Sequence, residues 1–172
     1  RNANTGRNAY WKLDDTGSCN GAGNLQSVNP DSGWQVGATG DFNNDGNDDV
    51  VWHNDNTGTN AYWQLDGSGQ IDDVTGLPTT GDAWQVGGAG DLNGDGNEDI
   101  LWRNTNTGTN AFWKMDSNGN FNGAKVLPSI PPDSPWQIGG TGDFNGDGND
   151  DILWRNANTG RNAYWKLDDT GS

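Results

Sequence analysis

Short runs of aromatic and aliphatic residues, separated by turns rich in Gly, Asn and Asp, extend along the whole chain. In one unit, residues 84–88 predict a first strand, and residues 100–104 predict a second strand after a polar loop. Residues 110–116 predict a third strand, in which successive side chains point to opposite faces. Residues 125–127, which end at a proline, suit an outer edge strand. We therefore expect four antiparallel strands in each unit and little helix.

The same unit recurs, with equivalent aspartates at Asp41, Asp91 and Asp143, that is at intervals of 50 and 52 residues. A period of about 40 to 50 residues with strand-sized segments is typical of the blades of a β-propeller. We predict an all-β fold built from four-stranded antiparallel blades. The predicted divisions are a partial blade of outer strands at residues 1–33, blade repeats at 34–83 and 84–135, and a partial blade at 136–172.

Tryptophan marks the repeat as clearly as the turns do. Only 30% of the residues are hydrophobic, but all ten tryptophans fall at repeat-equivalent positions, which is not the pattern of a disordered chain. They form three sets, and we expect them to supply the core. The sets are Trp34, Trp84 and Trp136; Trp52, Trp102 and Trp154; and Trp11, Trp63, Trp113 and Trp165.

One polar loop occurs three times, between the first and second predicted strands of a repeat. Its pattern is D-x-N-x-D-G-N-x-D, which places oxygen-bearing side chains on alternate residues of a tight turn. Such a loop suits Ca²⁺, which takes six to eight oxygen ligands and accepts a backbone carbonyl at the seventh position. We predict three Ca²⁺ sites, with the ligands Asp41, Asn43, Asp45, Asn47, Asp49, Asp91, Asn93, Asp95, Asn97, Asp99, Asp143, Asn145, Asp147, Asn149 and Asp151.

The loop differs from that of a helix-loop-helix calcium protein. Those proteins complete the ligand shell with a Glu at position twelve, but position twelve here is Trp52, Trp102 or Trp154. The last carboxylate is instead at position nine and is followed by strand-forming residues. The alternative is that Asn, Asp and Gly gather there only because turns favour them. We favour an ion-binding loop over a simple turn, because the spacing of the oxygen-bearing side chains is the same in all three copies.

The charge of the chain is strongly negative. Of the 24 acidic residues only Glu98 is a glutamate, and the formal net charge is −15. Three bound Ca²⁺ ions would bring that charge to −9 and relieve part of the self-repulsion. Nucleic acid is excluded as a partner, because the nine Lys and Arg residues are scattered and form no positively charged surface that could bind phosphates. No long apolar run predicts membrane insertion.

The stretch 142–154, which reads GDFNGDGNDDILW, resembles the FG-GAP and VCBS repeat families. The resemblance extends over nearly the whole chain. It implies a calcium-bearing β-propeller in which the aspartates and asparagines named above are the ligands. Members of these families range over adhesion heads, bacterial surface proteins and seven-bladed lectins, so the resemblance leaves the partner open. In the first loop Asn44 replaces the glycine of the other copies, and since Asn tolerates the left-handed conformation we expect that site to be retained.

The two ends of the chain share one sequence. Residues 155–172 are identical to residues 1–18, whereas the internal counterparts of this segment have diverged. Because three blades are fewer than the four to eight of a closed propeller, we expect the fold to be completed by further repeats or by self-association through the terminal repeats. Closed rings and head-to-tail filaments are both compatible with the repeat.

No catalytic site is predicted. His53 is the only histidine, no nucleophile accompanies it, and we interpret it as a solvent-facing strand residue. Paired acids such as Asp72–Asp73 point to opposite faces of a strand, so they do not form the two-carboxylate cleft of a glycosidase. Cys19, the only cysteine, has no partner for a disulfide within the chain.

Two interpretations remain for the aromatic residues that lie opposite the tryptophans on the third strands. These residues are Tyr10, Tyr62, Phe112 and Tyr164. They could stack on sugars between blades, or they could pack one sheet against the next, as large aromatics more often do. The sequence leaves the ligand-binding residues undetermined.

Together these features predict a non-catalytic, calcium-binding β-propeller module. Millimolar calcium outside cells suits such loops, so we expect an extracellular protein, secreted or at the cell surface. We expect adhesion or recognition of a glycan or a cell-surface protein. The alternative is a self-assembling subunit of an extracellular fibre.

Overall fold

The computed structural model describes all 172 residues, and it is all-β, with one short 3₁₀ turn (η1, Pro30–Ser32) as its only helical element. The thirteen strands are β1 (Asn8–Leu13), β2 (Cys19–Leu25), β3 (Trp34–Gly40), β4 (Asp49–Asn54), β5 (Asn60–Leu65), β6 (Ile71–Leu77), β7 (Trp84–Gly90), β8 (Asp99–Asn104), β9 (Asn110–Met115), β10 (Phe121–Leu127), β11 (Trp136–Gly142), β12 (Asp151–Asn156) and β13 (Asn162–Trp165). No helix in the structure is long and apolar enough to cross a membrane.

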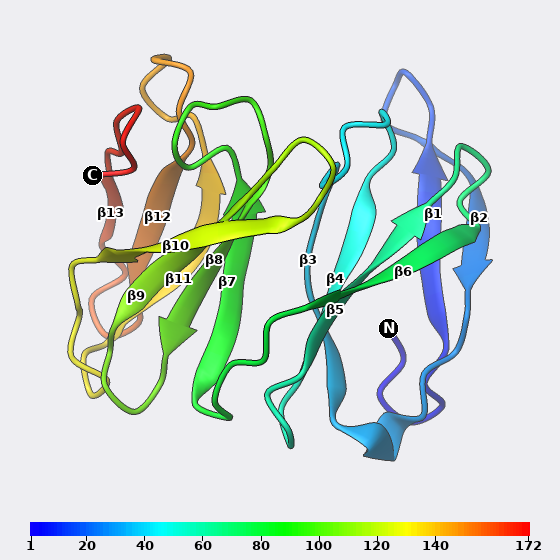
Figure 1. The fold of residues 1–172 in the computed structure, drawn as a ribbon, viewed down its shortest axis with the longest axis horizontal. Coiled ribbons are helices and arrows are strands. Elements are labelled where there is room, and N and C mark those ends of the chain that lie inside the picture. Colours follow the sequence, from blue (N-terminus) through cyan, green and yellow to red (C-terminus); the bar gives the residue numbers. More distant parts are fainter.

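The strands form four antiparallel sheets that follow one another in chain order. Sheet 1 contains β1 and β2, sheet 2 contains β3–β6, sheet 3 contains β7–β10, and sheet 4 contains β11–β13. Within a sheet, each strand pairs with its neighbours in sequence. The sheets stand side by side, and sheets 1 and 4 lie at opposite ends of the molecule, so the array is open rather than closed (Figure 1).

The first strands of sheets 2, 3 and 4 lie next to one another, with β7 in contact with both β3 and β11. Each of these strands changes register midway, where a glycine occupies the bulge. A Cβ at Gly37 would overlap Val86, and a Cβ at Gly87 would lie 2.6 Å from Ile138 Cδ1. Glycine is therefore required at these positions because the next sheet packs directly against the backbone.

The core lies between the sheets. One cluster, centred on Tyr62 and Trp102, joins sheets 2 and 3, and a second, centred on Phe112 and Trp154, joins sheets 3 and 4. Trp52, Trp102 and Trp154 are almost fully buried, as the sequence predicted. Trp11 is the exception, with 77% of its surface exposed, because β1 pairs only with β2.

Two predictions need correction. His53 is buried, with 3% exposure, and does not face solvent. Its ring packs edge-on against Trp102 of sheet 3, and its Nδ1 lies 2.6 Å from Asn60 Oδ1. The outer strand predicted at residues 125–127 begins earlier, at Phe121, because a register shift between Phe121 and Ala124 lets it pair with the full length of β9.

Candidate metal centre

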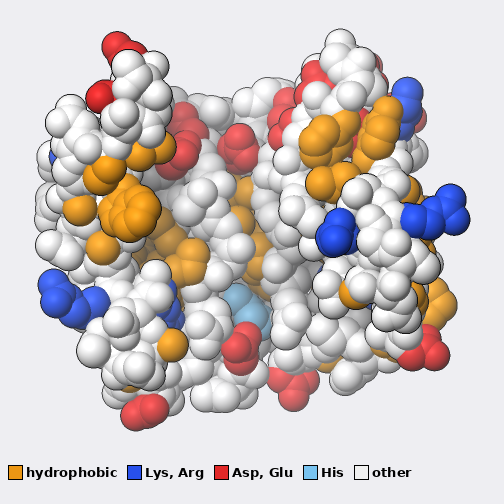
Figure 2. Space-filling model, turned by 180° about the vertical axis from the view of Figure 1, so that it is seen from behind, with side chains coloured by type: hydrophobic (Ala, Val, Ile, Leu, Met, Phe, Trp, Pro, Cys, Tyr) orange, Lys and Arg blue, Asp and Glu red, His pale blue; other side chains and the backbone are white.

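The three predicted ion loops join the first and second strands of sheets 2, 3 and 4. They connect β3 to β4, β7 to β8 and β11 to β12, and all three lie at the same end of the molecule, uppermost in Figure 1. Acidic side chains gather along this end in the space-filling view (Figure 2). The fold therefore places the three loops close to one another on a common surface.

Each loop is wrapped around the carboxylate at its first position. Asp41 Oδ1 accepts a hydrogen bond from the backbone N–H of Asp45 (3.0 Å), and Asp41 Oδ2 accepts one from Gly46 (2.8 Å). Asp91 and Asp143 make equivalent bonds in their own loops. Gly46 adopts φ +88°, and Asn44 adopts φ +58°, so the left-handed conformation expected of Asn44 is confirmed.

The carboxylate at position nine is held from the opposite side, by the third strand. Asp49 Oδ1 accepts the backbone N–H of Leu65 at 3.0 Å, and Asp99 and Asp151 accept those of Met115 and Leu167 at the same distance. All three aspartates have no exposed surface. One oxygen of each buried carboxylate is thus fixed by the sheet, which leaves the other to face the loop.

The second oxygen of the position-nine carboxylate is suited to binding a cation. Asp49 Oδ2 is buried and has no hydrogen-bond partner, which is costly for a charged atom unless an ion accompanies it. Asp99 Oδ2 accepts only the amide of Asn93, at 2.7 Å. No three acidic, His or Cys side chains lie close enough to hold a metal by themselves. A Ca²⁺ site here requires oxygens from the Asn amides and the backbone as well, which the hard, oxygen-preferring ion accepts.

The asparagines of the loops point their amino groups at the aspartates. Asn43 Nδ2 donates to Asp45 Oδ2 (3.0 Å), and Asn47 Nδ2 donates to Asp45 Oδ1 (2.8 Å). Rotation of each amide by half a turn would present oxygen in place of nitrogen. The residue types therefore fit Ca²⁺, with a local reorientation of the Asn side chains on binding.

Neighbouring loops also touch one another. Asn44 Nδ2 donates to Asn97 Oδ1 at 2.8 Å, which joins the first loop to the second. The backbone N–H of Asp150 donates to Asp91 O at 2.8 Å, which joins the third loop to the second. Order in one loop is thereby coupled to order in the next.

Position eight of the loop carries acids that sequence reasoning did not single out as a group. Glu98 lies against the backbone of Gly40 in sheet 2, and Asp150 lies against Gly90 in sheet 3. Burial, and then the charges of Asp150 and Asp48, raise the pKa of Glu98 to about 7. The only signal in the sequence is that an acid occupies this position in all three loops; their proximity follows from how the sheets pack.

The FG-GAP-like repeat family matches residues 41–102 and 91–154, so that residues 41–154 are covered by two overlapping repeats. The chain belongs to the FG-GAP-like repeat family. Each matched stretch begins at the first aspartate of one loop and ends at the second strand of the next repeat. No curated protein matches the chain.

The stability of the protein in metal-free buffer is expected to fall as the pH rises from 5 to 8. Burial, and then the charges of neighbouring aspartates, raise the pKa of Asp49 to about 6 and that of Asp99 to about 7. Because these values exceed those of the unfolded chain (about 3.9), the folded state binds more protons, and its stability is full below pH 4 and is lost through pH 6–7. Thermal melts at pH 5 and pH 8 measure this effect.

The variant Asp99→Asn is the control for that measurement, because it removes one raised pKa and retains the shape of the side chain. Its melting temperature in metal-free buffer should depend less on pH than that of the wild type. An identical dependence in both proteins would show that the repulsion of the whole acidic surface, rather than the buried position-nine carboxylates, sets the pH response.

Proposed function

We propose that this chain is a non-catalytic, calcium-dependent β-propeller module of an extracellular protein, with a role in adhesion or glycan recognition. The ligands of the three Ca²⁺ ions would be the loop residues named above. Bound Ca²⁺ would neutralise the loop carboxylates and connect the first, second and third strands of sheets 2, 3 and 4. The third strand of each of these sheets fixes the position-nine carboxylate, and the first aspartate of each loop holds the loop backbone by accepting its N–H groups.

The observation that carries this proposal is the fixed, buried position-nine aspartate in each loop. An isolated carboxylate with no exposed surface is unfavourable unless it is paired or binds a metal. Asp49, Asp99 and Asp151 each have one oxygen tied to the third strand, and Asp49 Oδ2 has no partner at all. Turn formation alone does not require a buried carboxylate at this position, whereas a cation site does.

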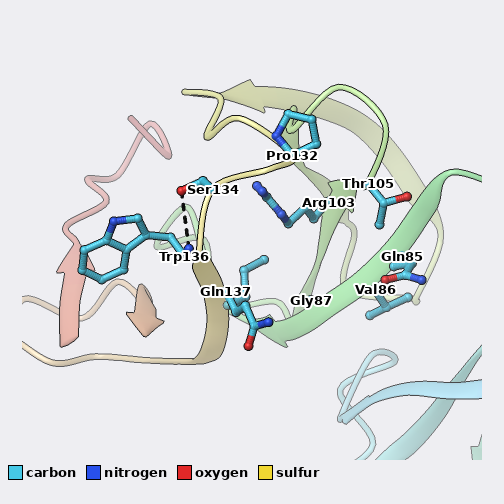
Figure 3. A pocket seen from close by; sticks show the side chains of 10 residues that line it. Gln85, Val86, Gly87, Arg103, Thr105, Pro132, Ser134, Trp136 and Gln137 are labelled. Atoms are coloured by element: carbon cyan, nitrogen blue, oxygen red, sulfur yellow. Dashed lines mark hydrogen bonds between the residues drawn. The ribbon is translucent and has the colours of Figure 1, made fainter. Parts of the chain in front are cut away.

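Recognition is better supported at the clefts between sheets than at the aromatics opposite the tryptophans. Tyr62 and Phe112 are fully buried and pack one sheet against the next, so they have no surface on which a sugar could stack. A cleft of about 450 Å³ lies instead between sheets 3 and 4 (Figure 3), where β7 and β11 begin and β8 ends, at the strand ends opposite the ion loops. A smaller cleft beside His53 occupies the equivalent place between sheets 2 and 3.

Polar groups that suit sugar hydroxyls line the larger cleft. Gln85 and Gln137 line it from neighbouring sheets, and Thr105 and Ser134 lie at its edge, whereas the ring of Trp136 points away from it (Figure 3). Arg103 lies at its centre, where its Nη1 donates to Asn110 Oδ1 at 3.0 Å and its guanidinium lies 5.5 Å from the ring centre of Trp154. A concave site with a few polar groups is the usual form of a small-ligand site.

A glycan array, probed with the full chain in calcium, tests the recognition proposal. We expect defined sugars to be retained, and we expect the double variant Gln85→Ala/Gln137→Ala to lose them, because both side chains are exposed and their removal leaves the fold intact. Thr57→Ala, which changes an exposed polar side chain away from this cleft, is the matched control. The absence of any retained sugar would contradict the glycan role, and equal retention by the double variant would place the site elsewhere.

One observation favours the second candidate function, a self-assembling structural subunit. Trp11 and Leu13 on sheet 1, and Phe144 and Tyr164 on sheet 4, expose 41–77% of their surfaces. The equivalent residues Trp113, Met115, Leu92 and Phe112 are buried where one sheet packs on another. Exposed apolar surface of this kind is typical of interfaces between molecules.

A further inference from the structure

The two clefts between neighbouring sheets differ in charge at equivalent positions of the repeat. The cleft between sheets 3 and 4 is lined by Arg103 and Thr105. The equivalent residues in the cleft between sheets 2 and 3 are His53 and Asp55. Arg103 is the only charged side chain that lines the larger cleft, whereas Asp55 brings a carboxylate to the smaller one. The larger cleft is therefore positive in a chain whose net charge is −15.

The guanidinium of Arg103 has no acidic partner. Its Nη1 and Nη2 donate hydrogen bonds to four oxygens, all of them neutral. These acceptors, at 3.0–3.4 Å, are Asn110 Oδ1, Gly108 O, Ile130 O and Pro131 O. The Nε of Arg103 takes part in none of these bonds, so its N–H remains available to a ligand.

Burial makes this unpaired charge costly. It lowers the pKa of the Arg103 guanidinium from its ordinary value, because a partly buried cation loses solvation. The ring of Trp154, with its centre 5.5 Å away, offsets part of that loss through a cation–π interaction. Asp133, which lies between two lining residues in sequence, is exposed and does not line the cleft. A bound anion would supply the missing counter-charge.

We propose that the cleft between sheets 3 and 4 binds an anionic sugar and places its carboxylate or sulfate group against Arg103. The inference rests on the recognition role proposed above and specifies the class of ligand. The Nε–H of Arg103 would donate a charge-assisted hydrogen bond to the anionic group. The neutral groups that would bind the sugar hydroxyls are the side chains of Thr105, Ser134, Gln85 and Gln137.

The position of the cleft also suits an anion. The acidic ion loops lie at the opposite ends of β7 and β8, which have seven and six residues. Strands of this length span about 20 Å. That distance exceeds the screening length of about 8 Å at physiological salt, so the loops do little to repel a bound anion.

The smaller cleft should not take the same ligand. His53 Nε2 lies 3.7 Å from Asp55 Oδ1 at this cleft. The Asp55 carboxylate occupies the place that Thr105 has in the larger cleft, and it would repel a second anion. We therefore expect one anionic sugar to bind per chain.

The variant Thr105→Asp tests the proposal without removing Arg103, whose hydrogen bonds support the fold. The N–H of Thr105 donates to Ala83 O at 2.7 Å. The N–H of the equivalent Asp55 donates to Gly33 O at 2.9 Å, so an aspartate fits this backbone position. The new carboxylate would pair with Arg103 and exclude a second anion. Thr105→Asn is the matched control, because both variants lose the hydroxyl and they differ from one another in charge.

A glycan array in calcium, probed with the full chain and with both variants, measures the preference. The array carries uronic-acid oligosaccharides, sulfated oligosaccharides and neutral forms of the same backbones. We expect the wild type and Thr105→Asn to retain an anionic class about 10-fold or more over its neutral form, because hydrogen bonds to charged groups are the stronger ones. Thr105→Asp should lose that preference and still retain the neutral sugars. The class retained by the wild type identifies the anion as carboxylate or sulfate.

Equal retention of anionic and neutral sugars by the wild type would overturn this inference and leave the recognition role standing. A Thr105→Asp variant that retains anionic sugars as Thr105→Asn does would have the same consequence. Absence of any retained sugar would overturn the recognition role together with the inference, so the two failures are distinguishable.

Discussion

Removal of calcium is expected to lower the melting temperature of the protein by about 15 °C or more. A ligand present at 100 times its dissociation constant stabilises the folded state by about 2.7 kcal/mol, so three independent sites give about 8 kcal/mol. For a chain of this length each kcal/mol corresponds to about 2–4 °C. Without the ion, the three aspartates of each loop repel one another, and a buried position-nine carboxylate lacks its counter-charge. Thermal melts in saturating calcium and in excess chelator at pH 7.5 measure the difference.

Magnesium at the same concentration is the control for that experiment. Mg²⁺ is smaller, requires near-octahedral geometry and gives up its waters reluctantly, so it should restore only a small part of the loss. Full recovery in Mg²⁺ would indicate general screening of the −15 charge rather than a specific site. A melting temperature that chelator leaves unchanged would contradict the calcium account.

Replacement of Gly119 by alanine is expected to destabilise the protein far more than replacement of Gly17. Both glycines adopt a left-handed conformation (φ +74° and +76°), which costs an alanine about 1–2 kcal/mol at either site. At Gly119 the new Cβ would also overlap the Tyr62 hydroxyl and lie 3.0 Å from Phe42 O, whereas at Gly17 it meets open space. Overpacking of this kind adds about 1–3 kcal/mol. Urea denaturation at a dilution where the chain is monomeric measures both losses.

The extra penalty at Gly119 should depend on Tyr62. In the background Tyr62→Ala, the extra cost of Gly119→Ala over Gly17→Ala should shrink, because the Tyr62 ring is gone and only the contact with Phe42 O remains. Equal losses for the two glycines in the wild-type background would mean that the aromatic contact between sheets contributes nothing to stability.

The strand pattern of this chain could be predicted because it is local. Each strand pairs with its neighbour in sequence, so the runs between Gly- and Asn-rich turns were enough to place the four strands of sheet 3 and the loop between its first two strands. The burial of the second tryptophan set followed from its recurrence at strand positions. The strand predicted at residues 125–127 was too short because a bulge hides its pairing.

Contacts between sheets could not be predicted in the same way. His53 packs on Trp102, which is 49 residues away, and nothing in the sequence near His53 indicates that neighbour. The burial of Glu98 likewise depends on the approach of the next sheet to Gly40. Sequence placed the loop residues in the right turns, but the support of Asp99 by the N–H of Met115 became visible only when the third strand was in position. The Ca²⁺ ligands themselves stay a prediction.

The most direct test of the calcium account is isothermal titration of the metal-free chain with CaCl₂, beside the variants Asp95→Ala and Asp147→Ala. Each variant removes the position-five carboxylate of one loop and leaves the buried position-nine carboxylate in place. The account predicts three ions per wild-type chain and two tight ions per variant. Absence of binding to the wild type, or a stoichiometry that neither variant changes, would contradict it.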